Sequence, residues 1–168
     1  MRLKIALLQL LPNGTLEGQL SKGMDACKKA RDMGADIALF PEMWSDGYAL
    51  PQDRQELDEL SVALDGDFVQ NLRKLAADLQ MAIGITILER HDPKSLNTLI
   101  LFDRKGEKRL HYAKVHTCDF DKERILSSGE DFYVVDLDIG IQISMRYCWK
   151  IDSAFRFDTE EKYYNQWR

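Results

Sequence analysis

Residues 36–44 read DIALFPEMW, a short apolar segment that leads into a proline and a glutamate. The run from Ile37 to Phe40 is typical of a buried β-strand. Pro41 has no amide hydrogen and favours extended geometry in the residue before it, so we expect the strand to end there. Glu42 would then lie at the carboxyl end of a strand, where open α/β sheets hold their ligands. Its apolar neighbours would partly desolvate it and favour a proton acceptor, although a solvated loop glutamate fits the same position.

The sequence before this strand predicts a strand-helix-strand unit. Residues 3–10 form an apolar run of strand length, which the turn signal Pro-Asn-Gly at residues 12–14 closes. Apolar side chains then recur at helical spacing, and Gly34 stands where a helix C-terminal cap belongs. The apolar positions are Leu20, Met24, Cys27 and Ala30. A strand, a helix and a strand in succession form the building block of a layered α/β fold.

The sequence after this unit predicts further helices and strands of the same layered fold. One amphipathic helix is expected over residues 52–64, and a second begins near Asp67, whose side chain can cap it. Strands are expected over residues 81–88, 97–102, 109–112, 132–137 and 139–145. Gly106 lies at the bend of a hairpin between two of these strands. The chain is therefore predicted to be an α/β protein whose helices cover a sheet.

Composition limits the partners that we expect. The 168 residues suit one domain, and 45% hydrophobic and 30% charged residues are typical of a soluble globular protein. A formal net charge of −5, with no Lys/Arg cluster, argues against nucleic acid as a partner. The apolar residues 5–11 are too few for a membrane span or a signal sequence, so we expect a cytoplasmic protein with no membrane partner.

Cysteine and histidine usage argues against disulfides and metals. The three cysteines are Cys27, Cys118 and Cys148. Their number is odd and no Cys-x-x-Cys pair occurs, which argues against a disulfide framework and a zinc site and leaves at least one free, reactive thiol. Cys27 lies on the apolar helix stripe and is expected to fill the core. His111 and His116 have no acidic partner pattern, so no metal site is predicted.

Three side chains with complementary chemistry lie at the ends of predicted strands. Glu42, Lys114 and Cys148 could converge on one rim of a layered sheet. A thiol nucleophile, a carboxylate that takes its proton and a cation that stabilises an oxyanion are a workable set for acyl transfer. Each residue alone also has an ordinary interpretation, as a loop acid, a solvated hairpin end and a small core residue.

Together, several short motifs resemble the nitrilase superfamily of carbon-nitrogen hydrolases. These motifs are Phe40-Pro41-Glu42, Lys114-Val115-His116, Glu123 followed by Gly129, and Ile143-Ser144-Met145 leading into Cys148. The resemblance implies that Glu42 is the general base, Lys114 stabilises the intermediate and Cys148 is the nucleophile. It implies that Glu123 is a second acid, which hydrogen-bonds Lys114 and helps to position the substrate. Cys118 occupies a position that the family does not use for chemistry and ranks below Cys148.

The resemblance also implies a fold and a reaction. The family fold is a four-layer α-β-β-α sandwich, and its members cleave amides, N-carbamoyl amines or nitriles through a cysteine thioester without a metal or organic cofactor. The residues after Lys114 favour an amide or N-carbamoyl substrate over a nitrile. The backbone N–H of Trp149 would help to hold the oxyanion. The expected partners are this small-molecule substrate and, as one option, further copies of the chain in a homo-oligomer.

The resemblance weakens after the nucleophile. Residues 149–168 are rich in aromatic and charged side chains and lack the Asp and Pro-Glu that the family places there. We therefore expect a carbon-nitrogen hydrolase domain over residues 1–148, a divergent tail over residues 149–168, and a sandwich truncated after the nucleophile strand. The alternative is a catalytically inactive remnant that acts as a binding or assembly module through exposed strand edges. A papain-like thiol enzyme fails because no local signature of that family surrounds a cysteine.

Overall fold

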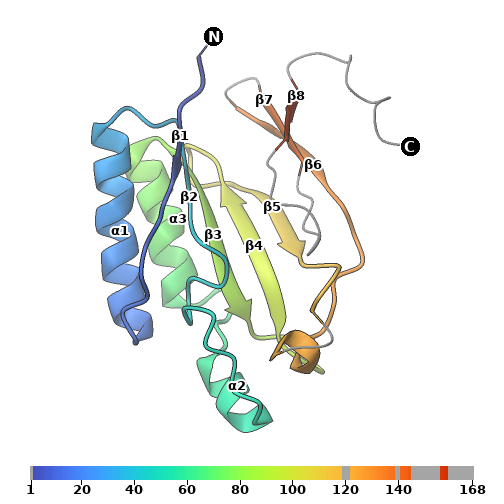
Figure 1. Cartoon of the computed structure of the whole chain (residues 1–168). Coiled ribbons are helices and arrows are strands. Elements are labelled where there is room, and N and C mark those ends of the chain that lie inside the picture. The colour runs from blue at the N-terminus through green and yellow to red at the C-terminus, as the bar shows by residue number, and fades with distance from the viewer. Residues whose placement is uncertain (1, 119–121, 139–140, 145–155, 159–168) are drawn as a thin grey trace.

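The computed structural model describes residues 2–118, 122–138, 141–144 and 156–158, the last two ranges as strands only. A five-stranded sheet has the order β1-β2-β3-β4-β5, and α1 and α3 cover one of its faces (Figure 1). Its strands are β1 (Ile5–Leu7), β2 (Ile37–Leu39), β3 (Ala82–Glu89), β4 (Leu96–Phe102) and β5 (Lys108–Ala113). The helices are α1 (Leu16–Asp32), α2 (Arg54–Leu60), α3 (Asp67–Leu79) and the 3-10 helix η1 (Lys122–Ile125). A second sheet contains β6 (Val134–Leu137), β7 (Ile141–Ser144) and β8 (Arg156–Asp158).

The predicted strand-helix-strand unit is present, with β1 and β2 parallel and α1 between them. The Thr15 side chain accepts a hydrogen bond from the Gly18 amide and so caps the start of α1. The chain leaves α1 through Gly34, whose φ of 81° is the left-handed conformation that glycine adopts without strain. Cys27, a residue of α1, is fully buried, and burial raises the pKa of its thiol to about 12. It fills the core, as expected.

The strand that begins DIALFPEMW ends where its proline predicts. The amide of Phe40 still donates to Gly84 of β3, at 3.0 Å, so pairing with β3 continues one residue beyond Leu39. Pro41 has no amide hydrogen with which to continue it. Glu42 therefore leaves the sheet at the carboxyl end of β2.

The helices after β2 differ in their bounds from the predicted ones. α2 ends at Leu60 because Val62 is extended: its amide donates to Leu88, and its carbonyl accepts from the Arg90 amide. The prediction that Asp67 caps the next helix is wrong by one position. Gly66 is the cap and Asp67 is the first helical residue, where its charge still suits the helix dipole.

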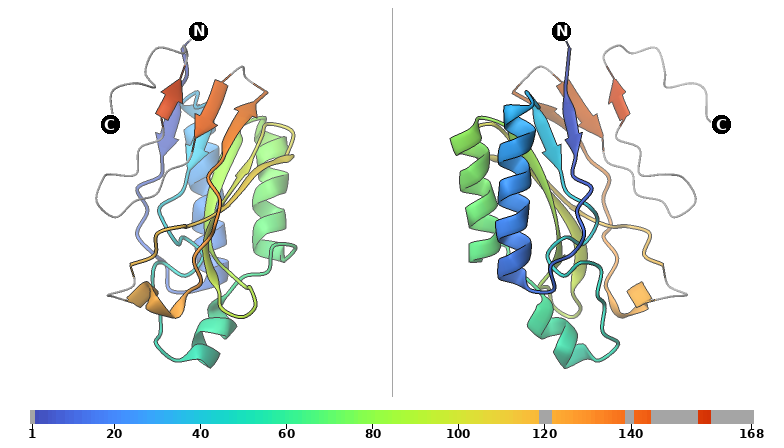
Figure 2. Two further views of the ribbon diagram at one scale, coloured as in Figure 1. Left: turned by 90° about the vertical axis from the view of Figure 1, so that its right-hand side faces the viewer. Right: turned by 60° about the vertical axis from the view of Figure 1, so that its left-hand side comes forward.

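Apolar side chains pack on both faces of the five-stranded sheet. The face under α1 and α3 carries Ile83, Ile85, Ile87, Ile100 and Phe102. The opposite face carries Ile37, Leu39, Leu99, Leu101, Leu110 and Tyr112, and Leu137 of β6 packs against this group. Figure 2 shows the second sheet on the side opposite the helices. The described residues thus form successive helix, sheet and sheet layers, as in the predicted sandwich.

None of the helices in the described part of the chain is long and apolar enough to cross a membrane.

Candidate active site

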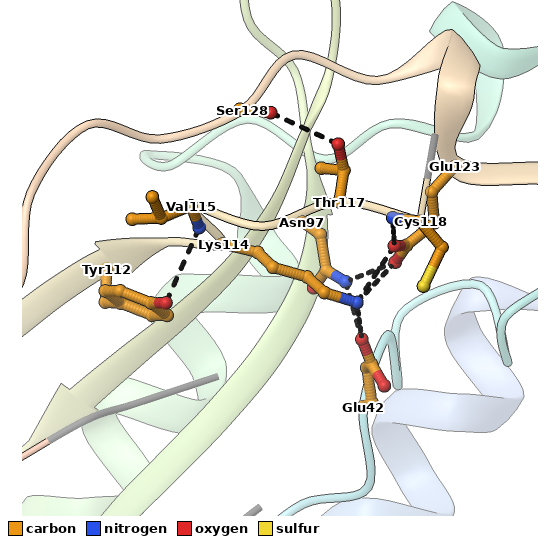
Figure 3. A network of polar contacts seen from close by, with 9 residues as sticks. All are labelled: Glu42, Asn97, Tyr112, Lys114, Val115, Thr117, Cys118, Glu123 and Ser128. Atoms are coloured by element: carbon orange, nitrogen blue, oxygen red, sulfur yellow. Dashed lines mark hydrogen bonds and ion pairs between the residues drawn. The ribbon is translucent and has the colours of Figure 1, made fainter. Parts of the chain in front are cut away.

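The structure brings Glu42, Lys114 and Glu123 together on the face of the sheet that lies away from α1 and α3 (Figure 3). Glu42 follows β2, Lys114 follows β5 and Glu123 belongs to η1. The Lys114 ammonium nitrogen lies 3.1 Å from Glu42 Oε1 and 2.9 Å from each carboxylate oxygen of Glu123. One cation is therefore shared by two carboxylates that lie 81 positions apart in the sequence, at residues 42 and 123.

Lys114 is buried, with 4% of its side chain exposed. Its backbone amide donates to the Asn97 carbonyl at 2.8 Å, which continues the β4–β5 ladder and fixes where the side chain starts. Burial alone would lower the pKa of the ammonium, but hydrogen bonds and charge from Glu123 and Glu42 outweigh it and raise the pKa above its ordinary value. Lys114 is thus a permanent cation at neutral pH.

Glu123 is held more completely than Glu42. Only 1% of the Glu123 side chain is exposed, and besides Lys114 it accepts from Asn97 Nδ2 at 3.0 Å and from the Cys118 amide at 2.8 Å. Burial would raise the pKa of its carboxyl group, but the Lys114 and Cys118 hydrogen bonds lower it below the ordinary value. A carboxylate held in this way remains ionised and serves as a fixed counter-ion.

The loop that carries Glu42 is fastened along β3. The Thr86 hydroxyl donates to the Pro41 carbonyl and accepts from the Trp44 amide at 3.1 Å. One side chain therefore holds the backbone both before and after Glu42. Met43 between them adopts a left-handed conformation with φ of 53°, which is rare for a residue with a side chain. About a quarter of the Glu42 side chain remains exposed. This loop therefore presents Glu42 in one defined place at the edge of the buried network.

The segment after η1 is clamped to β5 by a close backbone contact. The amide of Gly129 donates to the Lys114 carbonyl at 2.8 Å. A Cβ atom at position 129 would lie 2.3 Å from the Ala113 carbonyl oxygen, far inside van der Waals contact. Only glycine permits this approach of the segment to the backbone of Ala113 and Lys114.

Two site residues were missed in the sequence. Asn97 bridges Glu42 and Glu123, and its only signal is a single amide within the apolar run of β4. Tyr48 lies close to both carboxylates: burial, and then the charges of Glu42 and Glu123, raise the pKa of its hydroxyl. Tyr48 lies six residues after Glu42 on the same loop, and nothing in its spacing predicts which side chain it meets.

The three cysteines differ in their relation to the site. Cys118 lies beside Glu123, and burial together with the charges of Glu123 and Glu42 raises the pKa of its thiol despite the nearby Lys114. A thiol with a raised pKa is a poor nucleophile at neutral pH. Cys27 belongs to α1 and is buried in the core on the helix-covered side of the sheet. Cys148 and Trp149 lie outside the described residues.

The histidines have partners other than a metal. His111 Nε2 lies 2.8 Å from Glu89 on the helix-covered side of the sheet, and the His116 ring packs against Phe132 at 6.2 Å. Within the part of the chain that the structure describes, no group of three His, Cys, Asp or Glu side chains is placed to hold a metal ion.

Comparison with known proteins assigns the chain to a family, and the sequence motifs and the site geometry agree with that assignment. The carbon-nitrogen hydrolase family model matches residues 4–153, and the chain belongs to this family. The chain is 27% identical over 162 residues to the chloroplastic omega-amidase of Arabidopsis thaliana, with 89% of this chain and 43% of the relative covered. It is 30% identical over 152 residues to the glutamine-dependent NAD(+) synthetase of Thermotoga maritima, with 84% and 25% covered.

Solved structures show the same fold. The NitN amidase from Nesterenkonia sp. AN1 superimposes with a TM-score of 0.70 at 24% identity, over 88% of this chain and 58% of the amidase. The NitFhit protein of C. elegans also gives 0.70, at 20% identity, over 83% and 37%. The predicted membership of the nitrilase superfamily and the α-β-β-α class of fold are thus confirmed. The chain spans about half the length of most of the curated relatives that it matches.

Proposed function

We propose that the site hydrolyses non-peptide carbon-nitrogen bonds, in small amides or N-carbamoyl amines, through a thioester on Cys148. One observation carries the proposal: a buried ammonium, Lys114, lies between a fully hydrogen-bonded carboxylate and a second carboxylate that reaches the surface. This arrangement suits a reaction that forms an oxyanion and also moves a proton, because the cation and the proton acceptor are separate groups.

The contacts divide the work between the two carboxylates. Both carboxylate oxygens of Glu123 accept hydrogen bonds, from Lys114, Asn97 and Cys118. Glu123 is therefore the counter-ion that keeps Lys114 charged. Glu42 receives Lys114 and Asn97 on the same oxygen, Oε1. About a quarter of its side chain is exposed, so a bound molecule can approach this carboxylate. Glu42 is therefore the proposed general base.

The proposed reaction proceeds in two halves. The Cys148 sulfur bonds to the carbonyl carbon while its proton passes to Glu42, and the carbonyl oxygen gains the negative charge that Lys114 and the Trp149 backbone N–H stabilise. Glu42 then protonates the nitrogen as the C–N bond breaks, which releases ammonia or an amine and leaves the thioester. Water attacks the thioester and gives a proton to Glu42, which returns it to the departing Cys148 thiolate.

The relatives favour an amide as the bond that is cleaved. Proteins named omega-amidase occur among them from Arabidopsis thaliana and from Xenopus laevis. One mutant of the Nesterenkonia amidase is described in complex with butyramide, and another shows Michael addition of acrylamide at the active-site cysteine. We therefore place small aliphatic amides first and N-carbamoyl amines second. The net charge of −5 argues against a nucleic acid as the partner.

Ammonia release tests the proposal. Wild-type protein is assayed with butyramide, propionamide and N-carbamoyl-β-alanine, beside Glu42→Gln and Cys148→Ser. Glu17→Gln, an exposed glutamate in the first turn of α1, is the matched control for the charge change. Wild type and control should release ammonia, whereas both site variants should lose the activity by about a thousandfold or more.

A negative result in the ammonia assay would favour the alternative function. A folded wild-type protein that releases no ammonia, with iodoacetamide labelling at Cys148 no faster than that of a cysteine in the urea-unfolded chain, contradicts the proposal. That result favours the inactive remnant, and sizing over a range of concentrations would then show self-association through exposed strand edges.

A further inference from the structure

We propose that Asn97 is a positioning residue that ties Glu42 to Glu123 and holds Glu42 in place while its charge changes. The inference rests on the proposed function for its consequence, but the geometry that carries it is independent of turnover. Asn97 lies in β4 and is 6% exposed.

Asn97 closes a ring of four hydrogen bonds. Its Nδ2 donates to Glu42 Oε1 at 2.7 Å and to Glu123 Oε1 at 3.0 Å (Figure 3). Lys114 Nζ lies 3.1 Å and 2.9 Å from the same two oxygens. Each of the two carboxylate oxygens therefore accepts one hydrogen bond from Asn97 and one from Lys114.

The sheet fixes the place of this amide. The Asn97 carbonyl accepts from the Lys114 backbone amide at 2.8 Å, so β4–β5 pairing sets the start of both donor side chains. The next residue, Thr98, points to the other face of the sheet, where its hydroxyl donates to the buried Glu89 carboxylate at 2.6 Å. A shift of one residue in β4 would exchange these two faces and remove the bridge.

The two donors of the ring differ in what they do when Glu42 takes up a proton. The attraction between Lys114 and Glu42 depends on the carboxylate charge and weakens once the carboxyl group is neutral. An amide N–H donates to a carboxyl oxygen in either state, and it adds no charge of its own. Asn97 therefore keeps Oε1 anchored through both half-reactions.

Amide NMR tests the bridge without any need for turnover. In 15N-labelled protein, the Asn97 side-chain pair is the pair of signals that disappears in Asn97→Ser. Glu42→Gln should move one proton of that pair and leave the folded spectrum otherwise close to wild type. Thr98→Val, the matched control on the opposite face of β4, should leave the pair in place. An Asn97 pair that does not respond to Glu42→Gln would overturn the proposal.

Kinetics with the amide substrate that wild type turns over fastest test the role. Asn97→Ala should lower kcat roughly tenfold or more while KM stays within about threefold, because the lost donor holds the base and not the substrate. Thr98→Val should keep kcat within about twofold even where it lowers Tm, because its lost bond lies across the sheet. Equal kcat in Asn97→Ala and wild type, below both melting temperatures, contradicts a positioning role. If wild type turns nothing over, the proposed function fails and the NMR result alone decides whether the bridge exists.

Discussion

Lys114 Nζ contacts both carboxylate oxygens of Glu123, at 2.9 Å each, and Oε1 of Glu42 at 3.1 Å. Glu123 is also the more deeply buried of the two carboxylates, with 1% of its side chain exposed against 26% for Glu42. The closer partner is thus the one that water does not reach. This asymmetry separates a structural ion pair from the carboxylate that we propose as the general base.

Lys114→Met should destabilise the protein by about 3–5 kcal/mol, because it leaves a buried carboxylate without its cation. The loss should shrink in the double variant Lys114→Met/Glu123→Gln, which removes the uncompensated charge. Urea unfolding at pH 7 measures both values. A single variant as stable as wild type would show that the ion pair makes no net contribution, and Lys28→Met, an exposed pair with Asp25, is the control.

The buried Glu89 should make stability depend on acid pH. Burial alone would raise the pKa of its carboxyl group, but the His111 and Thr98 hydrogen bonds lower it. A lowered folded-state pKa means stability that is fully present above the unfolded pKa of about 4.3 and is lost as pH falls toward the folded pKa. Glu89→Gln should therefore show a shallower fall in Tm than wild type below about pH 4. Parallel Tm curves for the two proteins between pH 7 and pH 3 would contradict this.

Gly129→Ala should destabilise the protein by about 1–3 kcal/mol, because the new methyl group collides with the Ala113 carbonyl. Gly66→Ala is the milder control: its Cβ would lie 3.1 Å from the Ala63 carbonyl oxygen, and loss of a glycine cap costs about 1 kcal/mol or less. Chemical denaturation compares the two. The prediction fails if Gly129→Ala costs no more than Gly66→Ala.

Thr86→Val keeps the shape of the side chain but removes the hydroxyl that spans Glu42. The Trp44 amide and the Pro41 carbonyl each lose a partner, so we expect a loss of about 1–3 kcal/mol. If Glu42 is the general base, kcat should fall as well, because the loop no longer holds one geometry. Thr98→Val, which also loses a buried hydroxyl, should lower stability without this fall in kcat. Equal kcat values for the two valine variants would show that the Thr86 hydroxyl does not contribute to catalysis.

Native alkylation should distinguish the two cysteines that the structure describes from an activated thiol. Cys27 is fully buried with a pKa raised to about 12, and burial also raises the pKa of Cys118. At pH 7 both should react with iodoacetamide more slowly than the same cysteines in urea-unfolded protein, since the thiolate is the reactive form. Peptide mapping by mass spectrometry measures each rate. Labelling of Cys118 at the unfolded rate would show that its thiol is not protected by Glu123.

Local signals in the sequence were sufficient for the parts of the fold that are set locally. Pro41 predicts the end of β2, and Gly34 predicts the end of α1, because each imposes a backbone conformation on its immediate neighbours. The α2 boundary was not predicted, since Val62 leaves the helical pattern to pair with β3, a partner 27 positions away at Glu89.

The candidate site likewise contains residues that the sequence predicted and residues that it did not. Glu42 and Lys114 were found because each lies at or just beyond the end of a predicted strand, and Glu123 was found from the family resemblance. Asn97 was missed because a single amide in an apolar strand does not reveal which carboxylates it will meet. The distances that join it to Glu42 and Glu123 exist only once four separate segments have packed.

The ring formed by Glu42, Asn97, Lys114 and Glu123 draws its members from four segments: the loop after β2, β4, the residue after β5, and η1. No subset of these segments can assemble it, so the ring reports whether all four have packed together. Loss of pairing at any one of the four segments should therefore break the ring. The fraction of molecules in which the ring has formed is accordingly a direct measure of how much of this chain has folded.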